Sequence, residues 1–76
     1  MIQIDLKLFV TLAKYLPPGS EAYDIKEGTT INDLMIDLGI PHDIVKLIFI
    51  NGKKQGRNYI IQDKDRVGLF PPVGGG

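Results

Sequence analysis

The residues of this sequence that could take part in chemistry are concentrated at its C-terminus, which reads Phe70-Pro71-Pro72-Val73-Gly74-Gly75-Gly76. Consecutive prolines favour an extended stem, whereas the glycines beyond them carry no side chains and have wide backbone freedom. Residues 71–76 reach at most about 20 Å when extended, far enough to carry a terminal carboxylate into the active site of another protein. The α-carboxylate of Gly76 is an anion at neutral pH that can attack a phosphorus centre, but it undergoes acyl substitution only after activation. The tail therefore predicts a reactive carboxylate that a partner adenylates.

A run of terminal glycines is also typical of a frayed end or of an engineered linker. Here a Phe-Pro-Pro stem continues directly from the last apolar segment of the chain, and a frayed end has no need of such a stiff base. We therefore predict a flexible functional tail, residues 71–76, on a domain formed by residues 1–70.

Few other side chains offer catalytic or metal-binding chemistry. The chain has no cysteine and one histidine, His42, which excludes a thiol nucleophile, a disulfide framework and an iron–sulfur cluster. Asp63 and Asp65 lack the twelve-residue spacing of a calcium loop and are interpreted as turn residues. We expect no metal site and no bound cofactor.

Composition narrows the class of partner. Nine Lys and Arg balance nine Asp and Glu, and no basic stripe interleaved with aromatic residues argues for nucleic acid. The longest apolar runs, such as 47–50, are far shorter than the roughly 20 residues that span a bilayer. No signal-peptide pattern begins the chain. The expected partners are therefore proteins, with no membrane association, and the expected location is the cytoplasm.

Hydrophobic periodicity predicts the elements of the first half. Apolar residues alternate with polar ones in a first strand: Ile2, Ile4, Leu6, Leu8 and Val10. A short helical stretch over 12–16 and a weak strand over 22–25 follow. Thr30 is expected to cap the main helix and Gly39 to end it. The apolar stripe of that helix is Ile31, Leu34, Met35 and Leu38, and Met35 is interpreted as a core residue.

The second half reads as a hairpin followed by a last strand. The run 46–50 leads into Asn51-Gly52, a strong hairpin signal, and residues 53–55 return. The side chains of Lys53, Lys54 and Arg57 are interpreted as solvated. Arg66 to Phe70 forms the last strand, with Val67 and Leu69 on one face and Gly68 and Phe70 on the other.

Four or five strands with one main helix predict an α+β fold, a β-grasp (ubiquitin-like) roll in which a mixed sheet wraps over the helix. The first and last strands are expected side by side at the sheet centre, with the tail at one edge. Phe9 and Phe70 would then face outward where the tail leaves the domain, and we predict that they bind partner proteins. The alternative is that a covering loop buries both rings.

The sequence resembles the ubiquitin-like sulfur carriers of the MoaD/ThiS type, above all the small subunit of molybdopterin synthase. The resemblance rests on Lys7-Leu8-Phe9-Val10, Leu12 to Leu16, Thr30-Ile31-Asn32-Asp33-Leu34, Phe49-Ile50-Asn51-Gly52, Asp63-Lys64-Asp65-Arg66-Val67, and Phe70-Pro71-Pro72-Val73 with the terminal glycines. Two features depart from the family pattern. Lys64 stands where the family commonly has glycine, and Gly74 is a third terminal glycine.

The resemblance implies a protein cosubstrate, not an enzyme on its own. Gly76 would be adenylated by an E1-like activating enzyme that uses ATP, and then converted to a thiocarboxylate with sulfur from a sulfurtransferase. In the molybdopterin branch the tail enters the large synthase subunit, as part of a heterotetramer, and donates sulfur for the molybdenum or tungsten cofactor. Two alternatives remain open: a ubiquitin-like modifier joined to lysines, and a carrier for thiamin, tRNA thiolation or cysteine. A plain interaction domain with an inert tail is a third class.

Overall fold

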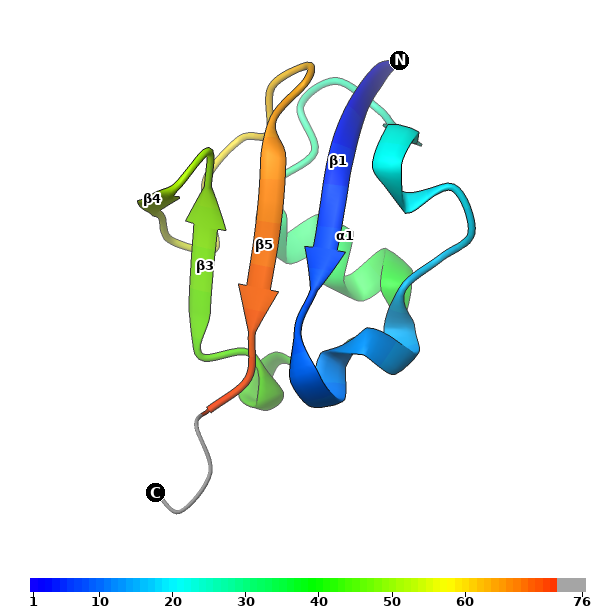
Figure 1. Ribbon diagram of the computed structural model, residues 1–76. Helices are drawn as coiled ribbons and strands as arrows, with labels where there is room; N and C mark the ends of the chain where they lie inside the picture. The colour runs from blue at the N-terminus through cyan, green and yellow to red at the C-terminus, as the bar shows by residue number, and fades with distance from the viewer. Residues whose placement is uncertain (73–76) are drawn as a thin grey trace.

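The computed structural model describes residues 1–72, in which a mixed β-sheet packs against one α-helix (Figure 1). The strands are β1 (Ile2–Leu8), β2 (Tyr23–Ile25), β3 (Leu47–Ile50), β4 (Lys53–Lys54) and β5 (Arg66–Phe70), and the helix is α1 (Ile31–Leu38). Short 3-10 helices cover Val10–Tyr15, Ser20–Ala22 and His42–Ile44. The sheet order is β2-β1-β5-β3-β4. These elements confirm the predicted β-grasp fold.

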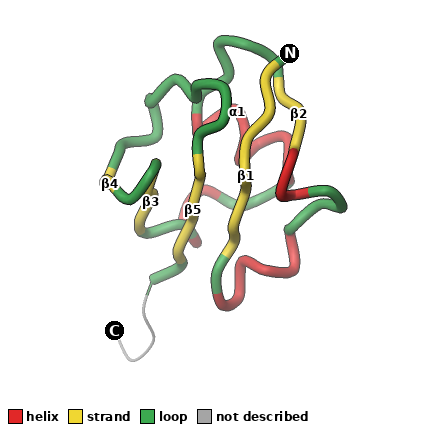
Figure 2. The backbone as a smooth tube through the Cα atoms, turned by 45° about the horizontal axis from the view of Figure 1, so that its top comes forward, coloured by secondary structure: helices red, strands yellow, loops and turns green. Residues whose placement is uncertain are grey.

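The first and last strands are neighbours at the centre of the sheet, as predicted. β1 and β5 run parallel, with Leu6 opposite Val67 and Leu8 opposite Leu69. β2 pairs with β1 in antiparallel orientation, and β3 pairs with β5 in the same orientation. Helix α1 crosses one face of the sheet and leaves the other face open (Figure 2).

The core lies between α1 and the inner face of the sheet. Its least exposed members, each less than 2% exposed, are Ile4, Leu6, Leu12, Ile31, Leu34, Met35, Ile61, Val67 and Leu69. Met35 is thus a core residue, as its place on the helical stripe predicted. Because inward and outward residues alternate along a strand, the burial of Val67 and Leu69 turns Gly68 and Phe70 toward the open face.

Helix α1 begins and ends at the predicted residues. The Thr30 hydroxyl accepts a hydrogen bond from Asp33 N at 3.1 Å, and the Asp33 carboxylate accepts one from Thr30 N at 3.3 Å. This reciprocal pair is a capping box, which satisfies backbone donors at the helix start. Gly39 ends the helix at φ 75°, a left-handed conformation that glycine adopts without strain.

Two tight turns hold residues other than glycine at positive φ. Asn51 and Gly52 have φ of 54° and 84°, as the predicted hairpin requires. Lys64 has φ 67°, and its N–H donates to Gln3 O at 2.6 Å. Asp63 supports the same turn, since its Oδ1 accepts from Gln3 N at 2.9 Å. The prediction that Asp63 is a turn residue is therefore confirmed.

Two predictions were wrong in detail. Val10 does not continue the inward row of β1: the strand ends at Leu8, and Val10 is 77% exposed at the start of a 3-10 helix. Arg57 is not a solvated hairpin residue. Its guanidinium donates to His42 O at 2.9 Å and to Val45 O at 2.7 Å, and so ties two loops together.

Within the described residues, no helix is long and apolar enough to cross a membrane. The same residues contain no cluster of three or more His, Cys, Asp or Glu side chains placed to hold a metal ion. The chain leaves the sheet through Pro71 and Pro72, at the end of a central strand and not along a lateral edge (Figure 1). Val73, Gly74, Gly75 and Gly76, which carry the predicted tail chemistry, lie outside the described residues.

Candidate functional site

Phe9 and Phe70 lie against each other on the open face, at the point where the chain leaves the sheet. Their ring centroids are 4.2 Å apart and the rings are inclined by 4°, which is a stacked arrangement. The parallel pairing of β1 with β5 brings the ends of both strands to the same place. Phe9 N also donates to Leu69 O at 3.1 Å. The structure thus brings together the two aromatic residues that the sequence singled out, while their role in partner binding stays a prediction.

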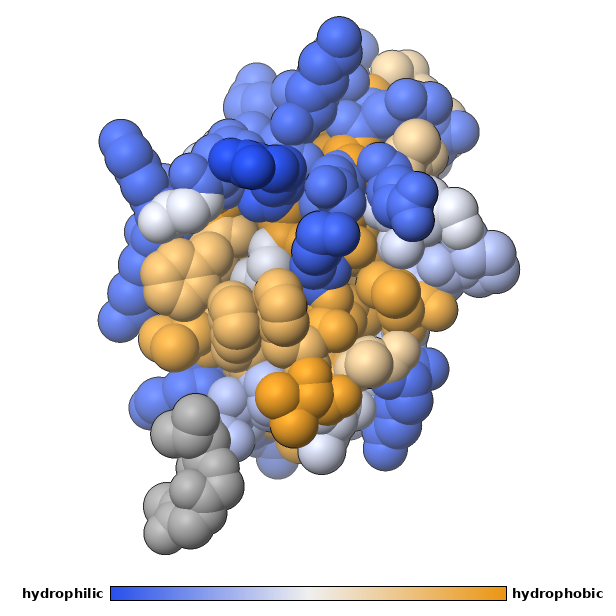
Figure 3. Space-filling model, in the orientation of Figure 1, coloured by the Kyte–Doolittle hydropathy of each residue, from blue (hydrophilic) through white to orange (hydrophobic). Residues whose placement is uncertain are grey.

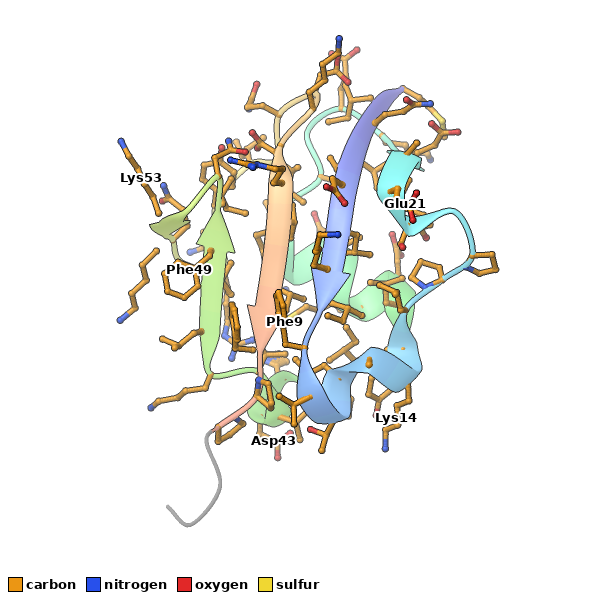
Figure 4. All side chains as sticks on the ribbon, viewed as in Figure 1. Phe9, Lys14, Glu21, Asp43, Phe49 and Lys53 are labelled. Atoms are coloured by element: carbon orange, nitrogen blue, oxygen red, sulfur yellow. The ribbon has the colours of Figure 1, made fainter. Side chains whose placement is uncertain are left out.

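A third aromatic ring, Phe49, was missed by the sequence analysis. It meets Phe70 edge to face, with centroids 5.5 Å apart and an interplanar angle of 84°. Strand alternation contains the signal for it, because Ile48 and Ile50 are buried and Phe49 between them must face outward. We call Phe9, Phe49 and Phe70 the aromatic cluster (Figure 4 labels Phe9 and Phe49).

Gly68 forms the floor beneath the aromatic cluster. A Cβ atom at this position would lie 3.4 Å from Phe9 Cε2 and 3.7 Å from Phe70 Cε1. Alanine would therefore be in van der Waals contact with both rings, and any larger side chain would occupy the space that they fill. The absence of a side chain at Gly68 lets the rings lie close to the backbone of the sheet.

The cluster borders an open depression of about 440 Å³. Its lining residues are Lys7, Phe9, Phe49, Gly52, Arg66, Val67, Gly68 and Phe70. Apolar surface is continuous around the cluster on this face of the molecule (Figure 3). Substrate pockets are typically concave and enclose most of their ligand, whereas this depression lies open on a sheet surface. Its shape and apolar lining favour contact with another protein over catalysis.

The turn that carries Phe9 is strained. Val10 follows Phe9 with φ 55°, a left-handed conformation that is an outlier for a β-branched residue. Leu12 N donates to Phe9 O at 3.0 Å, and the buried Leu12 side chain anchors the other end of the turn. Strained backbone persists where the surroundings enforce it. Here the buried Leu12 and the stacked Phe9 hold the turn from both sides.

The exit of the chain is fixed by the strand beside it. Lys46 N donates to Phe70 O at 2.8 Å, so the last residue of β5 is tied to the start of β3. Pro71 is half-buried and Pro72 is exposed. A segment that continues from Pro72 therefore starts directly beside the aromatic cluster.

Asp65, the buried polar residue among residues 1–72, has a structural role. Asp65, 5% exposed, accepts hydrogen bonds from the Tyr59 hydroxyl at 2.9 Å, from Asn51 Nδ2 at 2.8 Å and from Gln62 N at 2.8 Å. Burial raises the pKa of Tyr59, and so do its hydrogen bond to Asp65 and the negative charge of that carboxylate. Every oxygen of Asp65 has a partner, so the prediction that this residue shapes a turn is confirmed.

Comparisons with known proteins agree with this geometry. Residues 6–76 match the model of the ThiS family. No curated protein sequence matches the chain. Several solved structures are similar over nearly the whole chain. One is provisionally described as molybdopterin converting factor, subunit 1, from Pyrococcus furiosus (TM-score 0.72, 23% identity, 96% of this chain and 100% of the other). Another is the small archaeal modifier protein 1 of H. volcanii (TM-score 0.70, 23% identity, 96% and 100%). A crystal structure of SAMP1 from Haloferax volcanii gives a TM-score of 0.67 at 25% identity over 97% and 99% of the two chains.

Proposed function

Because this chain belongs to the ThiS family of ubiquitin-like sulfur carriers, we propose that it carries sulfur as a thiocarboxylate on Gly76. The observation that carries the proposal is the aromatic cluster beside the exit of the chain, where Phe9 and Phe70 stack at 4.2 Å. A carrier must be held by a partner while its tip reacts, and an apolar surface next to the tail supplies that hold.

The chemistry needs little from the carrier itself. An activating enzyme binds ATP, the Gly76 carboxylate attacks the α-phosphorus and pyrophosphate leaves, which creates an acyl adenylate. The outer sulfur of a persulfide on the sulfurtransferase then attacks the carbonyl carbon and AMP leaves. A thiol of the partner cleaves the resulting S–S bond, which releases the thiocarboxylate and leaves a disulfide on the partner. The glycines at 74 and 75 suit this reaction because they add no side chains to the narrow passage that leads to the carbonyl. ATP is thus a substrate of the partner, and we expect the carrier itself to bind no cofactor.

Within the family, we place this carrier in the molybdopterin branch. The Phe70-Pro71-Pro72-Val73 stem resembles the small subunit of molybdopterin synthase, and one similar structure is provisionally described as a molybdopterin converting factor subunit. The partners would be an E1-like adenylating enzyme, a sulfurtransferase and the large synthase subunit. The tail would enter the large subunit and donate its sulfur to a pterin precursor, inside a heterotetramer.

A modifier function is the second candidate, and the archaeal modifier structures favour it. Both functions share the acyl adenylate. In the modifier reaction, a lysine ε-amine of another protein attacks the activated Gly76 carbonyl, and an isopeptide bond forms. The two functions therefore differ in the atom that replaces AMP.

The experiment that separates them is the intact mass of the protein purified from native cells grown with adequate sulfur. A carrier shows a fraction in which one oxygen of the terminal carboxylate is replaced by sulfur, and a thiocarboxylate-selective reagent labels Gly76. Unlabelled protein, together with Gly76 joined to lysines of other proteins, would contradict the carrier function and support the modifier function.

A second experiment tests the tail itself. Deletion of Gly76, or Gly75→Val, should leave the fold intact and abolish pyrophosphate exchange with the activating enzyme.

A further inference from the structure

We propose that the partner of the aromatic cluster presents an apolar pocket bordered by carboxylates, and that three cations around the cluster set the rotation of the docked carrier. This inference rests on the proposed carrier function and adds the chemistry of the partner surface. The three cations are Lys7, Lys54 and Arg66, which we call the cationic arc.

The strand registers place a cation at each end of one row of side chains. Lys54 of β4 pairs with Phe49, Phe49 pairs with Gly68, and Gly68 pairs with Lys7 of β1. Residues directly opposite in neighbouring strands project from the same face of a sheet. The row therefore crosses the open face from one cation to the other, with an apolar centre.

The neighbouring rows differ from each other in polarity. Toward the end of β5, Phe70 pairs with Leu47 and stacks on Phe9. In the opposite direction, Arg66 pairs with Asp5. The open face is thus apolar beside the exit of the chain and hydrophilic at the far end (Figure 3). The arc borders the aromatic cluster on three sides, and the exit of the chain lies on the fourth.

Among residues 1–72, no carboxylate lies within ion-pair distance of two of the three cations of the arc. The one ion pair among residues 1–72 joins Lys7 Nζ to Asp5 Oδ1 at 3.8 Å. Lys54 and Arg66 are exposed, with no carboxylate of the described residues within ion-pair distance. The depression is likewise lined by no carboxylate of residues 1–72. A partner with carboxylates at these positions would gain two charge pairs at the rim, which is the usual place for orienting charges in an interface.

The zero net charge of the chain conceals a strong separation of charge. Residues 46–66, which form β3, β4 and the start of β5, hold six cations and two carboxylates. Residues 20–45, which form β2 and α1, hold six carboxylates and one lysine. β2 lies at the opposite edge of the sheet from β4, and α1 lies behind the sheet (Figure 2). An acidic partner surface would therefore attract the β3–β4 side of the molecule and repel the side formed by β2 and α1.

This arrangement also determines where the partner's carboxylates must lie. The site that accepts the tail handles an anionic carboxylate and the phosphates of ATP, so negative charge near its entrance would oppose binding. The arc lies on the three sides of the aromatic cluster other than the exit of the chain, so its carboxylate partners would border the pocket on the sides away from that entrance. Only one rotation of the carrier then lets the cations of the arc meet those carboxylates while the tail enters the active site.

The test uses the adenylating protein of the organism that makes this chain, recognised by its carrier-dependent exchange of pyrophosphate with ATP. Its association with the full-length carrier is measured by stopped flow at about 50 mM and about 500 mM salt, which changes electrostatic screening several-fold. The double variant Lys54→Glu/Arg66→Glu reverses two charges of the arc. The matched control, Lys14→Glu/Lys26→Glu, changes the net charge by the same amount in the 3-10 helix after β1 and in the turn after β2, outside the open face. Thermal melting confirms that both variants are folded.

We expect the arc variant to weaken binding about tenfold or more at low salt, chiefly through a slower association rate, and to reduce its salt dependence. The control variant should stay within about twofold of the wild type. Equal weakening by both variants, or no weakening by either, would overturn the proposal. The isolated carrier is also tested for binding of single-stranded RNA. If it binds RNA and the arc variant abolishes that binding, the arc recognises a polyanion, and the proposal is overturned. Absence of any carrier-dependent exchange would overturn the proposed function too, whereas normal exchange that is insensitive to the arc variant would overturn this inference alone.

Discussion

The side chain of Asn51 donates a 2.8 Å hydrogen bond from Nδ2 to Oδ1 of Asp65, and so joins the β3–β4 hairpin to the turn before β5. Asn51 Oδ1 in turn accepts from Arg66 N at 2.8 Å. Asn51 has positive φ in the hairpin turn, and its side-chain amide bonds the Asp65 carboxylate and the first backbone N–H of β5. One residue thus serves both the local turn and the long-range closure of the sheet.

Removal of the Asp65 carboxylate is the first test of the hydrogen bonds that join the hairpin to β5. Asp65→Ala should lower the free energy of unfolding by about 2 to 4 kcal/mol, because three donors lose their acceptor in a buried site. Urea denaturation measures the change. Asp63→Ala, which removes one exposed acceptor, is the control and should cost about 1 kcal/mol or less. Equal losses at the two positions would show that burial of the Asp65 network contributes nothing.

Tyr59 gives the fold a defined response to alkaline pH. Burial and the contact with Asp65 raise the pKa of Tyr59 above its ordinary value of 10.0, so the folded protein keeps this phenolic proton to a higher pH than the unfolded chain does. The corresponding stability is fully present below about pH 10 and is lost as pH rises from there through the folded-state pKa. Tyr59→Phe should be less stable at neutral pH but should decline less steeply above about pH 10. The control is Tyr23→Phe, because the Tyr23 hydroxyl does not bond to Asp65, and it should keep the wild-type slope of stability against pH. Parallel stability curves for the wild type and both variants would contradict the assignment to Tyr59.

Val10 stores strain in the turn that carries Phe9. Val10→Gly should raise the free energy of unfolding by up to about 1 kcal/mol, because relief of the left-handed conformation exceeds the added entropy of the unfolded chain. Denaturation curves of this variant are compared with those of Thr11→Gly, in which no positive φ is relieved and a loss of stability is expected. A destabilised Val10→Gly would mean that packing of this side chain outweighs the strain.

Gly68 should control the geometry of the aromatic cluster. Gly68→Val keeps β5 as a strand but places branched carbons where Phe9 and Phe70 now lie, so the two rings should separate. Ring-current chemical shifts and contacts between ring protons in the NMR spectrum measure the stack without any partner. Gly68→Ala is the matched variant, since its Cβ reaches only van der Waals contact, and it should keep the stack. Unchanged ring contacts in Gly68→Val would show that the rings do not depend on the floor beneath them.

The docking role of the cluster has its own test. Phe9→Ala and Phe70→Ala should each weaken association with the large subunit by about 1 to 4 kcal/mol, with little loss of stability in the isolated carrier. Titration calorimetry and thermal melting are run on the same samples. Ile36→Ala, which removes an exposed apolar side chain from α1, is the control and should bind normally. A large fall in melting temperature with normal binding would make the two rings core residues.

The fold was predictable because its signals are local. Alternation in β1, the capping box at Thr30 and the Asn51-Gly52 turn each lie within a few residues of sequence. The pairing of Phe9 with Phe70 followed from placing two central strands side by side. The missed features depend on distant segments. Arg57 became a clamp because the carbonyls of His42 and Val45 lie within its reach, and no local pattern encodes that approach.

Val10 shows a different limit of sequence reasoning. Its apolar character and spacing continue the alternation of β1, so period-two reasoning extends the strand through it. The chain turns earlier because Leu12 is drawn into the core and the backbone must reverse between the two. Tertiary packing thus overrode the local preference of a β-branched residue.

The parallel pairing of β1 with β5 has a consequence for synthesis on the ribosome. β1 is made first, but its central neighbour spans residues 66–70, so the sheet cannot close until translation has nearly reached the glycines. Contacts so distant along the chain raise contact order and postpone folding to the end of synthesis. A nascent chain that stops before residue 66 leaves β1 and β3 without the strand between them, and its exposed apolar surface makes it a substrate for proteolysis. Folding would thereby act as quality control for the domain, since a carrier that survives in the cell is one whose last strand has been made.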